Sequence, residues 1–250
     1  MRLKLVIFYS STHLVMAMGK RGKILPMDAW NDFELVVDLN DILRGQGADP
    51  EKIRNRRPTL VNAAERAHAL GLPLIHPIAL VRDVPVTKHL HGSILLDASA
   101  RLTGPLVTAH LAGAQRISAV LVTIGAELEE TSTRLFKTDP LLALALDGLG
   151  NAAVEHIGQQ VCRRIGEQAQ RNGLTVSTPL SPGEPDWPVD VGQPQIFTLV
   201  DGINVGIRVT PSGMMIPKKS ISFVVGIGQE MSRIEPCVVC SLRESCRYHD

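Results

Sequence analysis

Eight consecutive residues near the middle of the chain, Ile117-Ser118-Ala119-Val120-Leu121-Val122-Thr123-Ile124, decide the fold. The run is short, mostly apolar and rich in β-branched residues, which is typical of a buried strand. Gly104-Pro105 predicts that a helix opens before this strand and runs through Ala114, and Gly125 predicts a turn into a second helix after it. The centre of the chain is therefore expected to hold a buried strand between two helices.

A long helix is expected next. Asp139-Pro140 supplies an N-cap and a suitable first helical residue, and Gly173 stands at the C-cap position, so the helix should run to about Asn172. Its apolar face repeats every three or four residues: Leu142, Leu146, Leu149, Ala153, Ile157, Val161 and Ile165. Glycines recur beside this face at positions 150, 158 and 166. Each costs about 0.5–1 kcal/mol relative to alanine in a helix, so they predict close backbone packing.

Upstream of this region, two segments have clear patterns. Pro58 to Leu70 places apolar residues on one face and is followed by Gly71, which predicts a short amphipathic helix. Leu72 to Val86 is apolar but contains Pro73, Pro77 and Pro85. Proline cannot donate to a ladder, so this segment is expected to be extended at a sheet edge rather than a central strand.

The last third of the chain shifts to loop and sheet patterns. Thr175 to Pro194 contains five prolines and predicts a structured loop around Trp187. Gln195 to Val200 is expected to be helical. Ile203 to Val209 and Ser220 to Ile227 are expected to be strands.

Composition limits the possible functions. The chain has 250 residues, 44% hydrophobic and 20% charged, enough to bury one large core or two small ones. Its formal net charge is +1, from 26 basic and 25 acidic residues, which predicts no nucleic-acid partner. Leu5 to Gly19 is interrupted by polar residues and shorter than the roughly 20 residues that span a bilayer, so we expect no membrane partner and a cytoplasmic protein. The expected organisation is an extension at 1–26, a folded domain at 27–230 and a tail at 231–250.

The tail contains three of the four cysteines: Cys237, Cys240 and Cys246. The spacing C-x2-C followed by a third cysteine lets one turn present two thiolates to an ion while the next turn supplies another, which favours a zinc or iron-sulfur site. His249 could complete a zinc site, whereas an iron-sulfur cluster could use Cys162 or leave one iron open. The alternative is free thiols or a Cys237–Cys240 disulfide.

Several short motifs follow one another in a distinctive order. They are Val122-Thr123-Ile124-Gly125, Asp147-x-x-Gly150, Glu155, Ser181-Pro182-Gly183, Asp186-Trp187-Pro188, Gln193 and Met214-Met215-Ile216-Pro217-Lys218-Lys219-Ser220. From about Asp38 onward, this order and spacing resembles the reactivation domain of cobalamin-dependent methionine synthase, which binds S-adenosylmethionine (AdoMet). It is more closely similar to short stand-alone relatives of that domain with a three-cysteine tail.

The resemblance implies an α+β fold, a C-shaped domain with a central twisted, largely antiparallel sheet flanked by helices. It also implies that AdoMet lies in a shallow groove formed by the Pro-Gly loop and the segment after the Met-Pro motif. The residues implied at that groove are Ser181, Pro182, Gly183, Trp187, Met215, Pro217 and Ser220.

The family's role is to dock on a corrinoid-binding protein or methyltransferase while inactive cobalamin is reduced and remethylated. Cobalamin would therefore reach this chain only through a partner. The methyl acceptor would be the partner's cobalt, so whether this chain is itself an enzyme stays open.

Two residues depart from the family pattern. Leu180 stands where the family commonly has an arginine, and Glu184 where it commonly has a tyrosine. A leucine cannot hold the AdoMet carboxylate as an arginine does, and Glu184 adds a negative charge beside it. The alternative function is a non-catalytic docking or redox module with an iron-sulfur or zinc site that no longer binds AdoMet.

Overall fold

A computed structural model describes residues 27–184 and 186–231 and shows a mixed α+β fold built on one antiparallel sheet. The strands lie in the order β4-β3-β2-β5-β9-β6, and β1 pairs with β2. The strand bounds are β1 Asp28–Trp30, β2 Ile78–Leu90, β3 Ser93–Leu96, β4 Arg101–Thr103, β5 Arg116–Thr123, β6 Thr175–Val176 and β9 Ser220–Gly228. A separate hairpin pairs β7 Arg208–Val209 with β8 Met215–Ile216.

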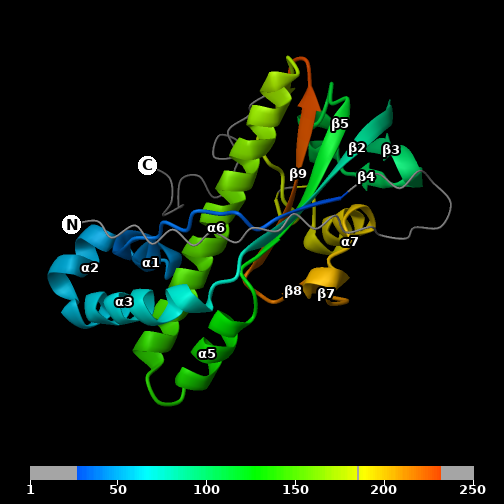
Figure 1. Cartoon of the computed structure of the whole chain (residues 1–250). Coiled ribbons are helices and arrows are strands. Elements are labelled where there is room, and N and C mark those ends of the chain that lie inside the picture. The colour runs from blue at the N-terminus through cyan, green and yellow to red at the C-terminus, as the bar shows by residue number, and fades with distance from the viewer. Residues whose placement is uncertain (1–26, 185, 232–250) are drawn as a thin grey trace.

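Helices cover both faces of the sheet (Figure 1). Their bounds are α1 Leu39–Gly45, α2 Pro50–Arg56, α3 Pro58–Gly71, α4 Pro105–His110, α5 Glu127–Leu135, α6 Pro140–Arg171 and α7 Val189–Leu199. Helix α6 runs along one face and packs against α1, α3 and α5, whereas α4 and α7 pack on the strands from the other side. None of the described helices is both long and apolar enough to cross a membrane.

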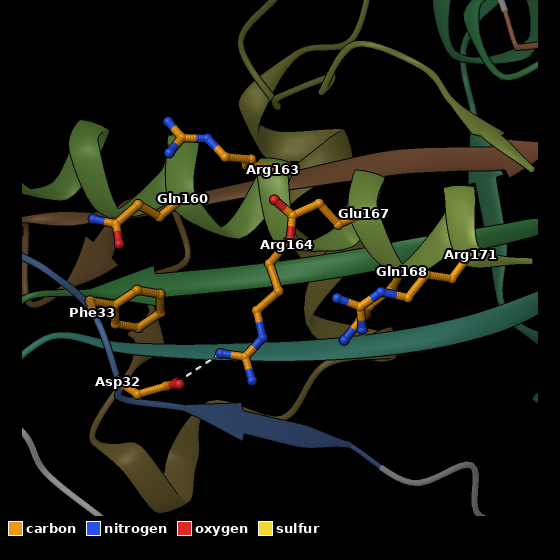
Figure 2. A pocket seen from close by; sticks show the side chains of 8 residues that line it. All are labelled: Asp32, Phe33, Gln160, Arg163, Arg164, Glu167, Gln168 and Arg171. Carbon is orange, nitrogen blue, oxygen red and sulfur yellow. Dashed lines mark hydrogen bonds and ion pairs between the residues drawn. The ribbon is translucent and has the colours of Figure 1, made fainter.

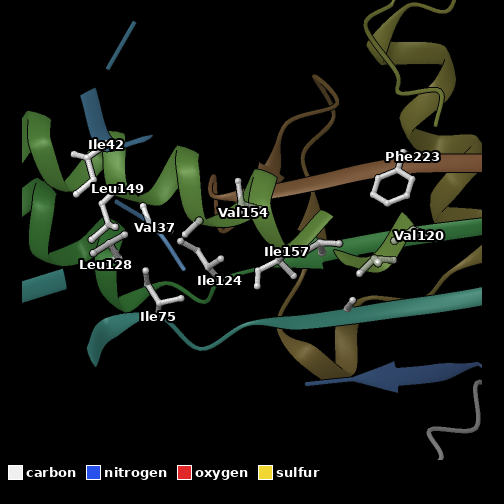
Figure 3. Close-up of a cluster of buried hydrophobic side chains, with 14 of the residues drawn as sticks. Val37, Ile42, Ile75, Val120, Ile124, Leu128, Leu149, Val154, Ile157 and Phe223 are labelled. Atoms are coloured by element: carbon white, nitrogen blue, oxygen red, sulfur yellow. The ribbon is translucent and has the colours of Figure 1, made fainter. Parts of the chain in front are cut away.

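Strand β5 lies between two hydrophobic cores, as its apolar run predicts. Val120 and Val122 face the core beneath α6, shown in Figure 3, whereas Ile117 and Leu121 face the core beneath α4 and α7. All four side chains are fully buried. Burial on both faces explains why the strand shows no alternation of polar and apolar residues.

The long helix is confirmed at both ends. The Asp139 side chain accepts a hydrogen bond from the Leu142 N–H, and Pro140 is the first helical residue. Beyond Arg171 the chain reverses at Gly173, whose φ of 70° lies in the left-handed region that glycine adopts without strain.

The expectation that 72–86 forms an edge segment is wrong. Strand β2 is central, with β5 on one side and β1 and β3 on the other. The Val86 N–H donates to Gln115 O, so the even-numbered residues of β2 bond to β5 and the nitrogen of Pro85 faces the opposite side. On that side β1 pairs with β2 only as far as Asp28 opposite Val81, and β3 only from Leu96 opposite Val86, so no strand of the described chain pairs with Pro85 there. Pro85 therefore costs no ladder hydrogen bond.

The last third also differs in part. Ile203–Val205 forms a turn of 3-10 helix rather than a strand, because Asp201 caps the Ile203 N–H and Gly206 adopts a φ of 77°. Only Arg208–Val209 remains as strand. The proline-rich region is shorter than expected, since α7 begins at Val189, whereas β9 confirms the strand predicted at 220–227.

Candidate functional site

The segment after β6 lies along the outer edge of β9. Leu180 exchanges two backbone hydrogen bonds of 2.9 Å with Val224, and the Ser177 N–H donates to Gly226 O. Antiparallel pairing continued for two more residues would set Pro182 opposite Ser222. The chain instead turns at Ser181-Pro182-Gly183, with Gly183 at a φ of 102°, so pairing on this edge ends at Val224.

Beyond that turn, no described segment pairs with the outer edge of β9. The Ile124 N–H donates to Lys219 O, so the odd-numbered residues of β9 bond to β5 and the even-numbered ones face outward. Within the described chain, the backbone N–H and C=O groups of Ser220 and Ser222 have no hydrogen-bond partner. Both residues are buried, 8% and 5% exposed. Unpaired backbone groups in such a place are costly, so a water or a ligand is expected to bind them.

The side chains at this edge are fixed by hydrogen bonds. The Ser222 hydroxyl donates to Gln193 Oε1 of α7 at 2.7 Å, and the Ser220 hydroxyl donates to Thr123 Oγ1 at 2.9 Å. Sequence reasoning selected Ser220 but not Ser222. The available signal was the two-residue spacing of these serines on a strand, which places both on one face.

The two predicted site segments meet at the first turn of α7. A β-carbon built on Gly183 would lie 3.2 Å from Val189 Cγ2, and one on Gly213 would lie 2.7 Å from Val189 Cγ1. The Pro-Gly loop and the turn of the β7–β8 hairpin therefore pack against the same side chain. The hairpin also holds Met215, which packs half-buried against the core.

The segment joining β8 to β9, which includes Pro217, is fastened to the helical layer. The Lys218 N–H donates to Glu129 Oε2 of α5 at 2.8 Å. Lys219 Nζ lies 2.7 Å from both Asp147 Oδ1 and Asn151 Oδ1 of α6, and its side chain is only 11% exposed. These contacts hold the start of β9 in position beside the unpaired edge.

The two departures from the family pattern turn inward. Leu180 is 2% exposed and packs in the core beneath α4 and α7. Glu184 Oε1 accepts a hydrogen bond from the Ser181 N–H at 2.8 Å, which stabilises the Pro-Gly turn. Burial raises the pKa of the Glu184 carboxyl, although its bond to Ser181 and the nearby His110 oppose the shift.

Trp187 fixes the position of this loop through its side chain and its carbonyl. Its indole is fully buried and packs against Gly192 of α7, where a β-carbon would lie 2.7 Å from Trp187 Cε2. The Trp187 carbonyl accepts the Gly183 N–H at 2.8 Å. In this structure the Trp187 side chain positions the loop and presents no surface to solvent.

A separate cavity of about 400 Å³ lies on the outer face of α6 (Figure 2). Arg164 reaches across it to Asp32 at 2.7 Å and stacks 4.3 Å from the centre of the Trp30 ring. These contacts tie α6 to the chain that leaves β1. None of the predicted site residues lines this cavity.

The predicted metal ligands Cys237, Cys240 and Cys246 lie outside the described residues. Within the described chain, no three histidine, cysteine or acidic side chains gather as a metal site. Cys162 is a half-buried free thiol on α6, and burial raises its pKa to about 11.

No protein-family model matches the sequence, and no curated protein does either. Among solved structures, the chain is similar to the MetH reactivation domain bound to AdoHcy, with a TM-score of 0.62 and 13% sequence identity. The match covers 86% of this chain and 82% of that chain. This likeness confirms the fold class: a curled antiparallel half-barrel sheet flanked by helices, as in that domain.

Proposed function

We propose that this chain is an accessory protein of corrinoid-dependent methyl transfer. It docks on a corrinoid-binding protein or methyltransferase and holds AdoMet beside β9 while the partner's cobalamin is reductively reactivated. The fold supports this role, since the similar structure is a reactivation domain with AdoHcy bound. The ordered motifs at Ser181-Pro182-Gly183 and Met215 to Ser220 also support it, because they flank the same edge of β9.

One observation carries the proposal, namely the buried, unpaired edge of β9 at Ser220 and Ser222. A heteroaromatic ring such as adenine carries a donor and an acceptor side by side, and it can satisfy an N–H and a C=O of an open strand edge. Pairing there would relieve the cost of leaving these groups without a partner.

Binding is expected to be weak because the carboxylate end of AdoMet lacks an arginine partner. Leu180 packs in the core, so an arginine substituted at this position would bury its charge rather than reach the groove. The Glu184 carboxylate already accepts a hydrogen bond from the Ser181 N–H, and as an acceptor it offers no partner to the AdoMet carboxylate.

The test uses two substitutions of one residue. Ser222→Pro removes the outward N–H without losing a bond to β5, whereas Ser222→Ala removes only the hydroxyl and serves as the matched control. We expect calorimetry to show AdoMet and AdoHcy binding to the wild type and to Ser222→Ala. Ser222→Pro should bind about 2- to 13-fold more weakly, the loss of one backbone hydrogen bond of roughly 0.5–1.5 kcal/mol. Equal affinities for the two variants would contradict binding at this edge.

The second candidate is a docking or redox module that keeps the fold and no longer binds AdoMet. The positions of Leu180 and Glu184 favour it, because Leu180 is buried in the core and the Glu184 carboxylate already accepts the Ser181 N–H, so neither offers a partner to the AdoMet carboxylate. Absence of binding heat with wild-type protein for both AdoMet and AdoHcy would support this candidate over the first.

A further inference from the structure

A cavity of about 320 Å³ lies between β2, the start of β4 and the C-terminal half of α7. It is on the α7 side of the sheet, because Val84 of β2 and Leu199 of α7 line it and both belong to the core beneath α4 and α7. Ala100 and Pro194 extend this apolar wall. None of the residues predicted for the AdoMet groove lines the cavity, so it is a separate feature of the fold.

Arg82 of β2 lines this cavity with only part of its guanidinium hydrogen-bonded. Its Nη1 donates to Leu199 O at 2.9 Å, at the C-terminal end of α7. Its Nε is buried and has no hydrogen-bond partner within the described chain. A guanidinium holds a carboxylate through two parallel N–H groups, and the neighbouring donors Nε and Nη2 form such a pair. The bond to Leu199 leaves this pair unused.

The charge around the cavity favours an anion. Arg82 and Arg101 both line it, and neither takes part in an ion pair among the described residues. Asp97 is the one acidic residue among the described residues that line the cavity, which leaves an excess of positive charge. A partly buried guanidinium without a counter-charge is costly, and a bound anion would offset that cost.

We propose that this cavity binds a small organic acid. Its carboxylate pairs with the Nε and Nη2 donors of Arg82, and its apolar body packs against Val84 and Leu199. The volume is at the small end of the range for ligand pockets, about 300–1,000 Å³, so the ligand is an acid of a few carbons. Inorganic phosphate can accept the same N–H pair, but it would leave the apolar wall without a partner.

The simpler role for Arg82 is to cap α7, since a cation near the last carbonyls of a helix is stabilising. That role needs a positive charge and one donor to Leu199 O, which a lysine could also supply. It gives no use to the buried Nε. The two roles therefore differ in one respect: capping predicts no response of Nε to an added carboxylate.

The test observes this N–H group directly on the full chain. Buried Nε–H groups are protected from exchange with water and can be followed in nitrogen–proton correlation spectra. Arg116 is the internal control, because its Nε is also buried and without a partner in the described chain, yet it lines a different cavity beside α6. Arg82→Lys and Arg116→Lys assign the two signals. Hexanoate is titrated in, with hexanol and inorganic phosphate in parallel.

We expect hexanoate to shift the Arg82 signal and to leave the Arg116 signal unchanged. Hexanol lacks the charge and phosphate lacks the apolar body, so each should bind at least about tenfold more weakly. The shift in thermal midpoint that hexanoate causes measures affinity in the variants. Arg82→Lys should bind hexanoate about 10- to 150-fold more weakly, the loss of one charge-assisted hydrogen bond, whereas Arg116→Lys should bind as the wild type does.

Thr198→Phe is a second variant that leaves Arg82 in place. Thr198 is exposed and lines the cavity, so the larger side chain should narrow it and abolish the response to hexanoate. Circular dichroism checks that each variant is folded. An Arg82 signal that ignores hexanoate, an equal response to phosphate, or binding that persists in folded Arg82→Lys or Thr198→Phe would overturn the proposal. The test uses no AdoMet, so its outcome is independent of the function proposed above.

Discussion

At the scale of single residues, Glu184 shows how a carboxylate can serve the fold rather than a ligand. Its side chain accepts the Ser181 N–H and closes the Pro-Gly turn, at the cost of a partly buried negative charge. Burial favours the protonated form, so the folded state binds a proton more tightly than the unfolded state does. Stability should therefore fall as pH rises from the unfolded pKa of about 4.3 through the higher folded value, and then stay level.

Glu184→Gln tests this relation. The amide oxygen of glutamine can still accept the Ser181 N–H, whereas the ionisable group is lost. We expect the variant to be more stable than the wild type at pH 7 and the two to converge below about pH 4, where glutamate is protonated in both states. Urea denaturation midpoints across pH 4 to 8 measure the difference. A constant gap between the two proteins over that range would show that the carboxylate pays no burial penalty.

At the scale of elements, α6 shows that its glycines serve different purposes. Gly150 faces the side chain of Lys219, just before β9, at 3.1 Å from a built β-carbon, and Gly158 faces Ile221 Cδ1, within β9, at 2.5 Å. The close backbone contact predicted for this series occurs instead at Gly148, where a β-carbon would lie 2.6 Å from Ile42 O of α1. Helix α1 thus crosses α6 at a point with no room for a side chain.

Gly148→Ala and Gly166→Ala form a matched pair on this helix. Alanine at position 148 should separate α1 from α6 and lower the free energy of unfolding by about 1–3 kcal/mol. Alanine at position 166 meets only an ordinary contact of 3.7 Å, so helix propensity should raise the stability by roughly 0.5–1 kcal/mol. Chemical denaturation of both variants gives the comparison. Effects of the same sign would mean that the α1–α6 crossing relaxes without cost.

At the scale of the whole molecule, the two tryptophans lie on opposite faces of the sheet. Trp30 belongs to the core beneath α6, and Trp187 to the core beneath α4 and α7. Strands β2, β5 and β9 supply side chains to both cores, so unfolding of these strands would disrupt both cores at once. We therefore expect the described chain to unfold as one cooperative unit.

Single-tryptophan variants test this expectation. Trp30→Phe leaves Trp187 as the reporter of one core, and Trp187→Phe leaves Trp30 as the reporter of the other. Within each variant, the fluorescence transition should coincide with loss of far-ultraviolet circular dichroism. Fluorescence that changes at a lower denaturant concentration than the dichroism in either variant would mean that one layer unfolds first.

The sequence alone determined the features whose cause is local. The mostly apolar, β-branched run at 117–124 predicts a strand, and the capping pair Asp139-Pro140 predicts where α6 begins, because capping and residue pattern depend on neighbours along the chain. The ordered motifs likewise predicted the fold class that the structural likeness confirms. The resemblance implied that Ser181-Pro182-Gly183 and the segment after the Met-Pro motif lie together, whereas the packing of the Pro-Gly loop and the β7–β8 turn against Val189 is seen only in the structure.

Only the tertiary structure decided the features that depend on partners across the fold. The presence of Pro85 predicted that this segment is not a central strand. Strand β2 is nevertheless central, and it tolerates the proline because the proline nitrogen faces a gap between β1 and β3 that no described strand fills. The resemblance placed Leu180 and Glu184 beside the expected AdoMet groove, whereas in the structure Leu180 packs in the core and Glu184 accepts the Ser181 N–H. The open edge at Ser222 likewise follows from strand pairing, which joins residues far apart in the chain.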